Sequence, residues 1–574
     1  MFRSDETLPV ESQTRHATST SHWAICTLAL FTTLTAILMA GEFRSQSSIP
    51  LKSTGVATVP LFNIWTIGWN ADRASHFLVG YWDAPIFYPT TQTFAFSEPQ
   101  PATLLVAPVC WGTNSPVAGY KAWMFLSLAL NGFFAALLLR RIGHGLFSQL
   151  VGGTAITLLP IIHQQIDVLQ LVPVWGIIWF WSCVFELDKH PRPKTTIETA
   201  VSFATCFALS THHALFLTLV FPFAAIVFVR RLADRQFLTA ALTSIVIASV
   251  LILPIVLPIH IAAQTNEFSR NKRTVTAQSV KLDQYLATPK NSLIHFQKFE
   301  SSPNRSFNVG WFRTLMAFGG ISAAFFSASR RQWILFLLAT TVSAMAFSLG
   351  LNLEIFGWKP WLWLSETLPG FGQVRNVFRF AWLVQIAVVL LAVEGLSAIL
   401  AVCQQRISPS RLKPTLAVLV VVPGVLIATE IWPEPAQRGG VPDSIRHHAW
   451  TSYIRDNQTQ GRPIACLPFA SGNSISDFDM TTRWMIHGLE HKAPMLNGYS
   501  GFFPKSYFTL RNLVNEEFPS DRVISRFAEH DVEHLVVARK YCPPSELLAA
   551  VPDTLELVYE DEIANVDIYR LSVP

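Results

Sequence analysis

Charged residues are scarce in this sequence of 574 residues. Only 14% of the residues are Asp, Glu, Lys or Arg, whereas soluble domains carry roughly 25%. Hydrophobic residues make up 51%, and the mean hydropathy is +0.34. They form separate runs of membrane-spanning length between short polar loops, which excludes one large soluble core. The formal net charge of +5 is too small to indicate a nucleic-acid partner.

The motifs of common soluble enzymes are missing. No GxGxxG follows a strand-like run, and there is no P-loop, GxSxG or HExxH. The seven cysteines show no CxxC spacing, although Cys466 and Cys542 share the C-terminal segment and could pair there. No internal repeat indicates the paired halves of many secondary transporters, which weakens a transporter hypothesis.

The start of the chain lacks the pattern of a cleavable signal peptide. Residues 1–22 are mostly polar, and the apolar run at 23–40 ends without a small-x-small cleavage site. We therefore predict a cytoplasmic tail over 1–22, followed directly by the first transmembrane helix.

Eleven apolar runs are long enough to cross a bilayer as helices. They lie at 23–40, 119–139, 146–162, 169–187, 197–211, 214–229, 237–258, 311–328, 332–350, 377–402 and 415–432. The predicted fold class is an α-helical polytopic membrane domain of about eleven transmembrane helices, over residues 23–432.

Basic residues mark the ends of alternate helices in this count. They are Arg140, Arg141, Lys189, Arg192, Lys194, Arg230, Arg231, Arg235, Arg330, Arg331, Arg406, Arg411 and Lys413. All of them fall on one side of the membrane, and short loops rich in Lys and Arg stay in the cytoplasm. This pattern predicts a cytoplasmic N-terminus and an external C-terminus.

The same count places three long loops outside, at 41–118, 260–310 and 351–376. The last of them is rich in tryptophan and is typical of a helix lying on the membrane surface. Residues 433–574 begin with a Pro- and Gly-rich linker and then have ordinary soluble composition, with helix-like and β-rich runs in alternation. We predict a soluble extracytoplasmic α/β domain there.

Three carboxylates lie among aromatic residues and prolines in the first external loop: Asp72, Asp83 and Glu98. Carboxylates can bind a divalent metal or take a proton from an attacking hydroxyl, and aromatic faces can stack on a sugar. The alternative is an interfacial loop whose aromatics anchor it while its acids face water.

Two further external turns carry histidines. His163 and Gln165 lie between the third and fourth helices, and His212 and His213 lie between the fifth and sixth. These turns face the same side as the acids, so the histidines could converge on one site. An isolated histidine at a helix end can equally be a capping or interfacial residue.

Arginines gather near the outer surface. Arg375 and Arg379 begin the tenth helix, one turn apart, and suit the phosphate of a membrane-bound lipid or ordinary snorkelling at the interface. The 260–310 loop adds seven Lys and Arg residues against three acids. This excess either attracts anionic lipid headgroups or covers a phosphate-bearing substrate.

At these residues the chain resembles a family of bacterial multi-pass membrane proteins that are similar in fold to the GT-C glycosyltransferases, including the YfhO-like and dolichyl-phosphate-mannose-transferase-like groups. The resemblance rests on Asn63–Trp69, Asp83–Pro89, Thr93–Glu98, His163–Pro173, Leu368–Phe380 and Leu496–Pro504. It covers nearly the whole chain in order, and it implies a place in the bacterial inner membrane.

The resemblance also implies chemistry. GT-C enzymes use a polyprenyl-phosphate-linked sugar and an acidic residue of the first external loop, which serves as a base or as a ligand of a divalent metal such as Mg or Mn. Relatives carry an acid before proline where this chain has Val59. Either Asp83 or Glu98 then carries the chemistry, with His163 orienting the site, or this member has lost it.

Two functions follow as hypotheses. The first is a membrane glycosyltransferase that passes the sugar to an envelope glycan, lipid or protein on the outer face. Its substrate would contact Asp72, Gln165, His212, His213, Arg375, Arg379, Asn497 and Tyr499. The second is a non-catalytic envelope protein, or a flippase or transporter of lipid-linked glycans, that uses the same polar surface.

Overall fold

The computed structural model describes residues 10–45, 47–52, 55–299, 305–325, 328–406, 417–441, 448–545, 547 and 554–571. Helix α1 (Val10–Leu38) already includes the second half of the predicted N-terminal tail, and residues 1–9 lie outside the described part. The basic residues Arg411 and Lys413, predicted on the cytoplasmic side, also lie outside it.

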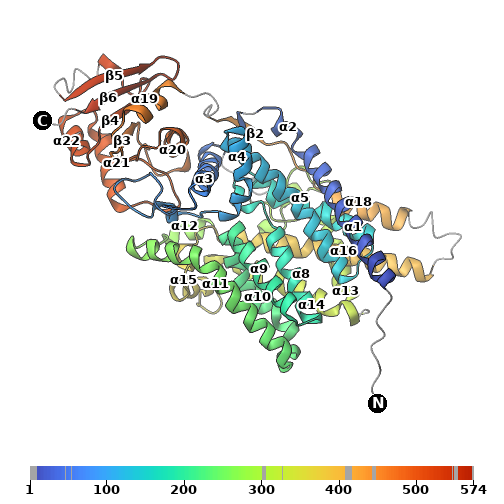
Figure 1. Cartoon of the computed structure of the whole chain (residues 1–574). Coiled ribbons are helices and arrows are strands. Elements are labelled where there is room, and N and C mark those ends of the chain that lie inside the picture. Colours follow the sequence, from blue (N-terminus) through green and yellow to red (C-terminus); the bar gives the residue numbers. More distant parts are fainter. Residues whose placement is uncertain are drawn as a thin grey trace.

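Helices make up most of the chain before residue 430 (Figure 1). After α1 they are α2 (Ala40–Phe43), α3 (Thr58–Ser75), α4 (Ala107–Thr113), α5 (Pro116–Ile142), α6 (Leu146–Thr157), α7 (Pro160–Gln164), α8 (Trp175–Lys189), α9 (Pro193–Leu209), α10 (Thr211–Ala224), α11 (Arg235–Thr265), α12 (Lys272–Ala277), α13 (Trp311–Ala323), α14 (Ala328–Ser348), α15 (Pro360–Thr367), α16 (Ala381–Arg406) and α18 (Val422–Thr429). Each of the eleven predicted apolar runs contains a helix.

Seven helical segments of the described chain are long and apolar enough to cross a membrane. They are Ser21–Leu38, Pro116–Ile142, Leu146–Gln164, Leu169–Lys189, Thr211–Ala233, Arg235–Thr265 and Val377–Cys403. The four additional transmembrane helices in the predicted total of eleven remain a prediction.

Local signals in the sequence set the helix ends. In α5, the Ser115 side chain accepts a hydrogen bond from the backbone of Ala118, and Pro116 follows at the first helical position. The helix stops at Gly143, whose φ of 94° suits glycine and returns its N–H to the last turn. In α11, the Asp234 carboxylate caps the first turn in the same way.

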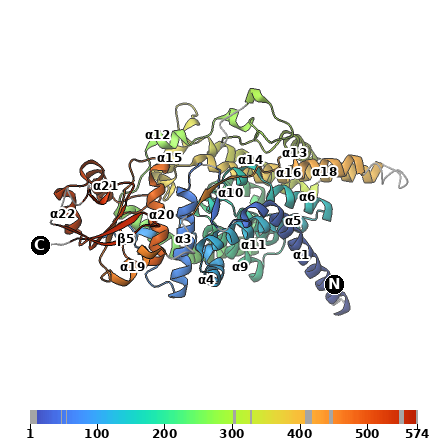
Figure 2. The same ribbon diagram turned by 90° about the horizontal axis from the view of Figure 1, so that it is seen from above.

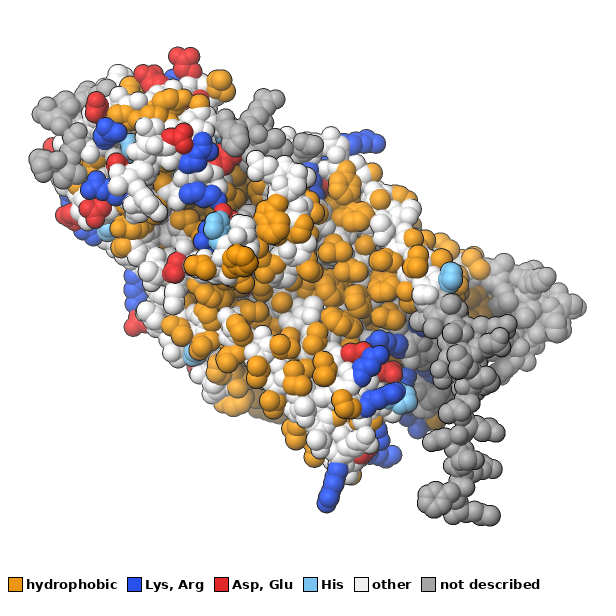
Figure 3. All heavy atoms as spheres, viewed as in Figure 1, with side chains coloured by type: hydrophobic (Ala, Val, Ile, Leu, Met, Phe, Trp, Pro, Cys, Tyr) orange, Lys and Arg blue, Asp and Glu red, His pale blue; other side chains and the backbone are white. Residues whose placement is uncertain are grey.

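The helical part presents an apolar surface. Figure 3 shows hydrophobic side chains spread over this face, whereas charged side chains gather over the C-terminal segment and at the opposite edge. Helix α11 is the clearest case, because only 11% of its most apolar stretch is buried and Leu242, Ile245, Val246, Val250 and Leu253 are exposed. Such a surface suits lipid rather than water. The chain is a multi-pass membrane protein.

The basic helix ends meet on one side of the helical part. Lys189 Nζ donates a hydrogen bond to the carbonyl of Arg141 at 2.8 Å. Arg231 Nε lies 2.9 Å from the Asp188 carboxylate, and Arg330 donates to the carbonyl of Gly143 at 3.2 Å. The ends of α5 and α8, the segment Ala225–Ala233 after α10 and the start of α14 are therefore neighbours, as the alternation of basic loops predicts.

We expect this basic side to face the cytoplasm, because short Lys- and Arg-rich loops are retained there. Reporter fusions on it should give a cytoplasmic signal, and fusions on the other side an external one. The positions to test are Arg141, Lys194, Arg231 and Arg331 for the first group and His213 and Asn291 for the second. A mixed pattern within either group would contradict the arrangement.

Two carboxylates lie deep within the apolar helices, and both are satisfied by the fold. Glu394 is 2.6 Å from His144 Nε2 and 3.2 Å from Arg330, at the basic side. Glu430 accepts the backbone N–H groups of Phe312 and Arg313 at the start of α13. Because these acids hold helices together, neither marks an ion pathway through the membrane, and the transporter hypothesis gains no support from them.

The C-terminal segment contains a four-stranded sheet (Figure 1). Its strands are β3 (Ile464–Leu467), β4 (His534–Ala538), β5 (Leu555–Asp561) and β6 (Val566–Leu571), in the order β3-β4-β6-β5. The β3–β4 pair is parallel and the other two are antiparallel. Four helices accompany it: α19 (Ala449–Asn457), α20 (Asp479–His491), α21 (Lys505–Glu517) and α22 (Asp521–Glu529). The segment thus contains both helices and strands, as its alternating helix-like and β-rich runs indicate.

The C-terminal segment packs on the predicted first external loop. That loop is not irregular, because it contains the 18-residue helix α3, whose buried side chains include Leu61, Ile64 and Trp65. Helix α3 lies beside α20 in both ribbon views (Figures 1 and 2). A short antiparallel pair, β1 (Ser48–Leu51) with β2 (Gln437–Gly440), ties the linker back to the same loop.

Candidate functional site

An apolar cavity of about 410 Å³ opens beside α10 and α11. Its apolar lining includes Phe207, Leu215, Ile252, Val256, Ile259 and Phe268, and its polar end is formed by Glu98, His212, Arg270, Arg375 and Arg379. Because α11 carries exposed apolar side chains along its length, this cavity lies next to the surface that suits lipid.

Glu98 and His212 form a close pair at the polar end of the apolar cavity. Glu98 Oε2 lies 2.9 Å from His212 Nδ1, and Glu98 Oε1 accepts the backbone N–H of His212 at 2.9 Å. Burial opposes the charged carboxylate, but the charge and hydrogen bonds of His212, with the charge of Arg379, outweigh it and lower the pKa of Glu98 to about 2. Glu98 is therefore ionised at neutral pH.

Local structure fixes this pair. Glu98 lies between two short 3₁₀ segments, η1 (Thr93–Phe96) and η2 (Pro101–Val106), which turn the chain toward α10. Ser210 ends α9 and caps α10, because its hydroxyl accepts the backbone N–H of His213. His212 is thus held in the first turn of α10, where its side chain and N–H both reach Glu98.

A second cavity, of about 930 Å³, lies between the helical part and the C-terminal segment. We call it the arginine cavity, because its described lining contains Arg270, Arg305, Arg375, Arg379 and Arg511 but no Asp or Glu. Aromatic side chains of both parts complete it, among them Phe62, Phe478, Tyr499, Phe503 and Phe508. The lining is therefore cationic and aromatic, which suits an anionic or sugar-like ligand.

The two cavities share one wall. Residues that line both are Ser97, Gln170, Arg270, Arg375, Asn376, Arg379 and Gly501. Arg270 is fixed in this wall, because it donates to the carbonyl of Gly501 at 2.7 Å and lies 3.6 Å from the centre of the Phe502 ring. Burial, together with the charge of Arg375, lowers the pKa of Arg270 to about 9. The wall places guanidinium groups between an apolar space and a polar one.

Arg375 and Arg379 line the same two cavities. Arg375 lies in the extended stretch before η9 (Val377–Phe380), and Arg379 is inside that turn, so the two are not on one α-helix. Arg379 is only 7% exposed, and its Nε has no hydrogen-bond partner among the described residues. A buried guanidinium with a free donor calls for an anion.

The other two predicted acids do not line either cavity. Asp83 is exposed, and its carboxylate accepts the backbone N–H of Gln92 at 2.8 Å, which closes a turn. Asp72 lies 2.7 Å from Lys492 Nζ and also pairs with Arg73. Burial raises the pKa of Asp72, but Lys492 and Arg73 more than offset this and lower it. Asp72 therefore ties α3 to the C-terminal segment.

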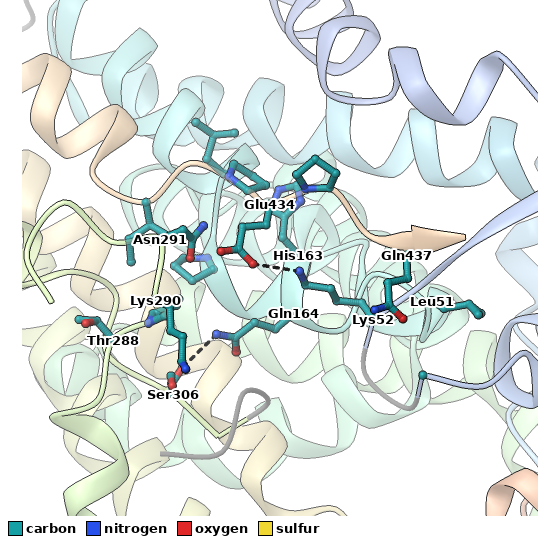
Figure 4. Close-up of a pocket in the computed structure, with 17 residues that line it drawn as sticks. Leu51, Lys52, His163, Gln164, Thr288, Lys290, Asn291, Ser306, Glu434 and Gln437 are labelled. Atoms are coloured by element: carbon teal, nitrogen blue, oxygen red, sulfur yellow. Dashed lines mark hydrogen bonds and ion pairs between the residues drawn. The ribbon is translucent and has the colours of Figure 1, made fainter. Parts of the chain in front are cut away.

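His163 is separate from His212 and His213. Its Nε2 lies 2.9 Å from the carbonyl of Thr157, and it lines a third cavity of about 510 Å³ near Lys52 and Glu434 (Figure 4). Lys52 and Glu434 pair across that cavity at 3.4 Å. The expected convergence of His163 on the same site as Glu98 and His212 is not found.

Of the remaining predicted residues, some line the arginine cavity and the others have a structural role or line neither cavity. Gln165 and Tyr499 line the arginine cavity. Asn497 is fully buried and exchanges hydrogen bonds with the backbone of Cys466 in β3, so its role is structural. His213 is buried with its ring 6.4 Å from that of Trp382, and it lines neither cavity.

Three arginines that line the arginine cavity were not among the site residues predicted from the sequence: Arg270, Arg305 and Arg511. The excess of basic residues in the 260–310 loop was a signal for the first two. Nothing in the local sequence marks Arg511, because it reaches the cavity from α21 in the C-terminal segment.

The residues at the site fit a protein-held divalent metal poorly. Mg²⁺ and Mn²⁺ prefer several oxygen ligands, and Glu98 is the only carboxylate that lines either cavity among the described residues. Within the described ranges no three His, Cys, Asp or Glu side chains come together in a way that could hold a metal ion.

Comparison with known proteins gives a family and a fold. A family model described as "Domain of unknown function (DUF6311)" matches residues 65–423. No curated protein matches the sequence. The arabinofuranosyltransferase AftD from Mycobacteria has a TM-score of 0.55 at 14% identity, over 96% of this chain and 42% of that one. The apo oligosaccharyltransferase from Archaeoglobus fulgidus has a TM-score of 0.50 at 12% identity, and the match covers 96% of this chain and 74% of that one.

At these identities the likeness shows the fold alone. That fold is the one of the GT-C glycosyltransferases, and the predicted resemblance is confirmed. The chain spans less than half the length of the arabinofuranosyltransferase.

Proposed function

The chain belongs to the family described as "Domain of unknown function (DUF6311)", and we propose that it is a membrane glycosyltransferase that moves a sugar from a polyprenyl-phosphate donor to an acceptor of the cell envelope. The donor would lie in the apolar cavity, on the outer face of the bacterial inner membrane. The acceptor, a glycan, lipid or protein, would enter through the arginine cavity.

One observation carries this proposal: the apolar cavity beside α11 ends on an ionised Glu98, its partner His212, and the arginines of the shared wall. A polyprenyl-phosphate-linked sugar has the same division, with a long apolar chain and an anionic phosphate that gains a second negative charge when the sugar leaves it. The apolar side chains of α11 suit the polyprenyl chain of the lipid, and Arg375 and Arg379 suit its phosphate.

In the proposed reaction, the acceptor hydroxyl oxygen bonds to the anomeric carbon of the sugar while the bond from that carbon to the phosphate oxygen breaks. The lipid phosphate leaves with the electron pair, and Arg375 and Arg379 balance its charge. Glu98 Oε2 lies 2.9 Å from His212 Nδ1, so its negative charge favours the neutral tautomer that carries its proton on Nδ1, and Nε2 of that tautomer can accept the proton of the hydroxyl. Glu98 by itself is a weak base, because its charged form is strongly stabilised.

A non-catalytic lipid-binding protein is the second candidate, and Val59 is the observation that favours it. Val59 lines the arginine cavity, at the position where the family resemblance implies an acid. An isopropyl group there can neither accept a proton nor bind a metal. If the chemistry is retained, it must have moved to Glu98 and His212.

The direct test is transfer of a radiolabelled sugar from polyprenyl-phosphate donors by the purified protein in detergent micelles, with envelope extracts as acceptor. We expect labelled product from at least one donor, and none when Glu98 is replaced by Gln. Binding of the lipid phosphate without transfer from any donor would support the non-catalytic alternative.

A further inference from the structure

The arginine cavity holds more positive charge than a single lipid phosphate needs. Arg270, Arg375 and Arg379 belong to the wall that it shares with the apolar cavity, whereas Arg305 and Arg511 line the arginine cavity alone. None of these five arginines forms a salt bridge with a described carboxylate. The charge of Glu98 acts on Arg379 and offsets only part of this positive charge, and partly buried charge of this kind is costly unless a ligand supplies the anion.

Arg511 is held in place by neutral partners. Its Nη1 donates to the carbonyl of Gly472 and to the side-chain oxygen of Asn473, both at 2.8 Å. Its Nε and Nη2 donate to the Asn512 side chain. The nearby carboxylate of Asp477 instead accepts hydrogen bonds from Ser474. The Arg511 side chain is thus oriented without being neutralised.

Arg305 is arranged in the same manner from the opposite side of the cavity. Its Nη2 donates to the side-chain oxygen of Gln278 at 2.6 Å, and its guanidinium lies 4.4 Å from the centre of the Phe378 ring. Its Nη1 is buried and has no hydrogen-bond partner among the described residues. Burial also lowers the pKa of Arg305, as expected for a cation without a counter-ion.

From this geometry we propose that the arginine cavity binds an acidic sugar, with a phosphate or carboxylate group that Arg305 and Arg511 hold while the aromatic side chains pack on the ring. This inference rests on the proposed function, because it names the chemical class of the acceptor. The buried Nη1 of Arg305, which has no hydrogen-bond partner among the described residues, can donate to either kind of acid group, and Arg511 supplies a second fixed positive charge. The faces of Tyr499 and Phe508 suit a sugar.

The test is calorimetric titration of the full chain in detergent micelles with glucose 6-phosphate, glucuronate and glucose. Farnesyl phosphate is present in excess, so that the lipid-phosphate site is filled. We expect at least one acidic sugar to bind about tenfold or more tightly than glucose, and the tighter of the two identifies the acid. Equal binding of all three sugars would overturn the proposal.

Variants locate the site. Arg305→Gln should weaken the acidic sugar about tenfold while farnesyl phosphate binds as before, and Arg305→Lys should keep most of the binding. Arg522→Gln is the matched control, since Arg522 is exposed and pairs with Glu517 outside both cavities. Acidic-sugar binding that survives Arg305→Gln would refute this site.

The experiments distinguish a failure of the acidic-sugar inference from a failure of the proposed glycosyltransferase function. If the parent protein binds farnesyl phosphate but binds neither acidic sugar more tightly than glucose, this inference alone is removed. Arg305-dependent binding without sugar transfer removes the enzyme and leaves the site.

Discussion

Glu98→Gln is expected to abolish sugar transfer, with a loss of about 10²–10⁴ in rate, while lipid-phosphate binding is retained. The substitution keeps the shape of the side chain but removes the negative charge that lies 2.9 Å from His212 Nδ1. Because the pKa of Glu98 is about 2, this charge is present at every pH at which the enzyme would be assayed. Initial rates with a labelled donor, and farnesyl phosphate titration, measure the two properties separately.

His212→Gln should cause a loss of similar size, and the double variant should be little worse than either single one, because the two residues act as a unit. Asp83→Asn is the matched control. Asp83 is exposed and only accepts a backbone hydrogen bond, which Asn can also accept, so its activity should remain near that of the parent. A large loss for Asp83→Asn with full activity for Glu98→Gln would reverse the assignment.

The sequence predicted the helices better than it predicted the site. Apolar runs and basic loops depend on local composition, so each predicted run contains a helix, and the basic ends of α5 and α8 are neighbours. Helix α3 was hidden within a predicted loop, because Asn63 and Asn70 interrupt its apolar pattern. Both side chains are buried and bonded to distant parts of the chain, which no local pattern reveals.

The choice between Asp83 and Glu98 shows what sequence patterns cannot decide. Both acids follow aromatic residues in the same loop, 15 positions apart. Their difference arises from long-range contacts: Glu98 meets the start of α10, more than a hundred residues later, whereas Asp83 closes a turn of its own loop. Arg375 and Arg379 both line the apolar cavity, and their spacing and their place at the outer end of an apolar run were visible in the sequence.

Arg375→Ala is expected to raise the apparent KM for the lipid donor by about 10–100-fold, with a smaller effect on kcat. A charge-assisted hydrogen bond to phosphate is worth about 1.5–3 kcal/mol, and a contact already present in the bound donor acts mainly on binding. Arg375 is half-buried and makes no salt bridge with a described acid, so its removal leaves no carboxylate without a partner. Arg235→Ala is the control, because it removes the same charge from the exposed start of α11, away from both cavities. Steady-state rates over a range of donor concentrations separate KM from kcat, and an unchanged KM in Arg375→Ala would place the donor phosphate elsewhere.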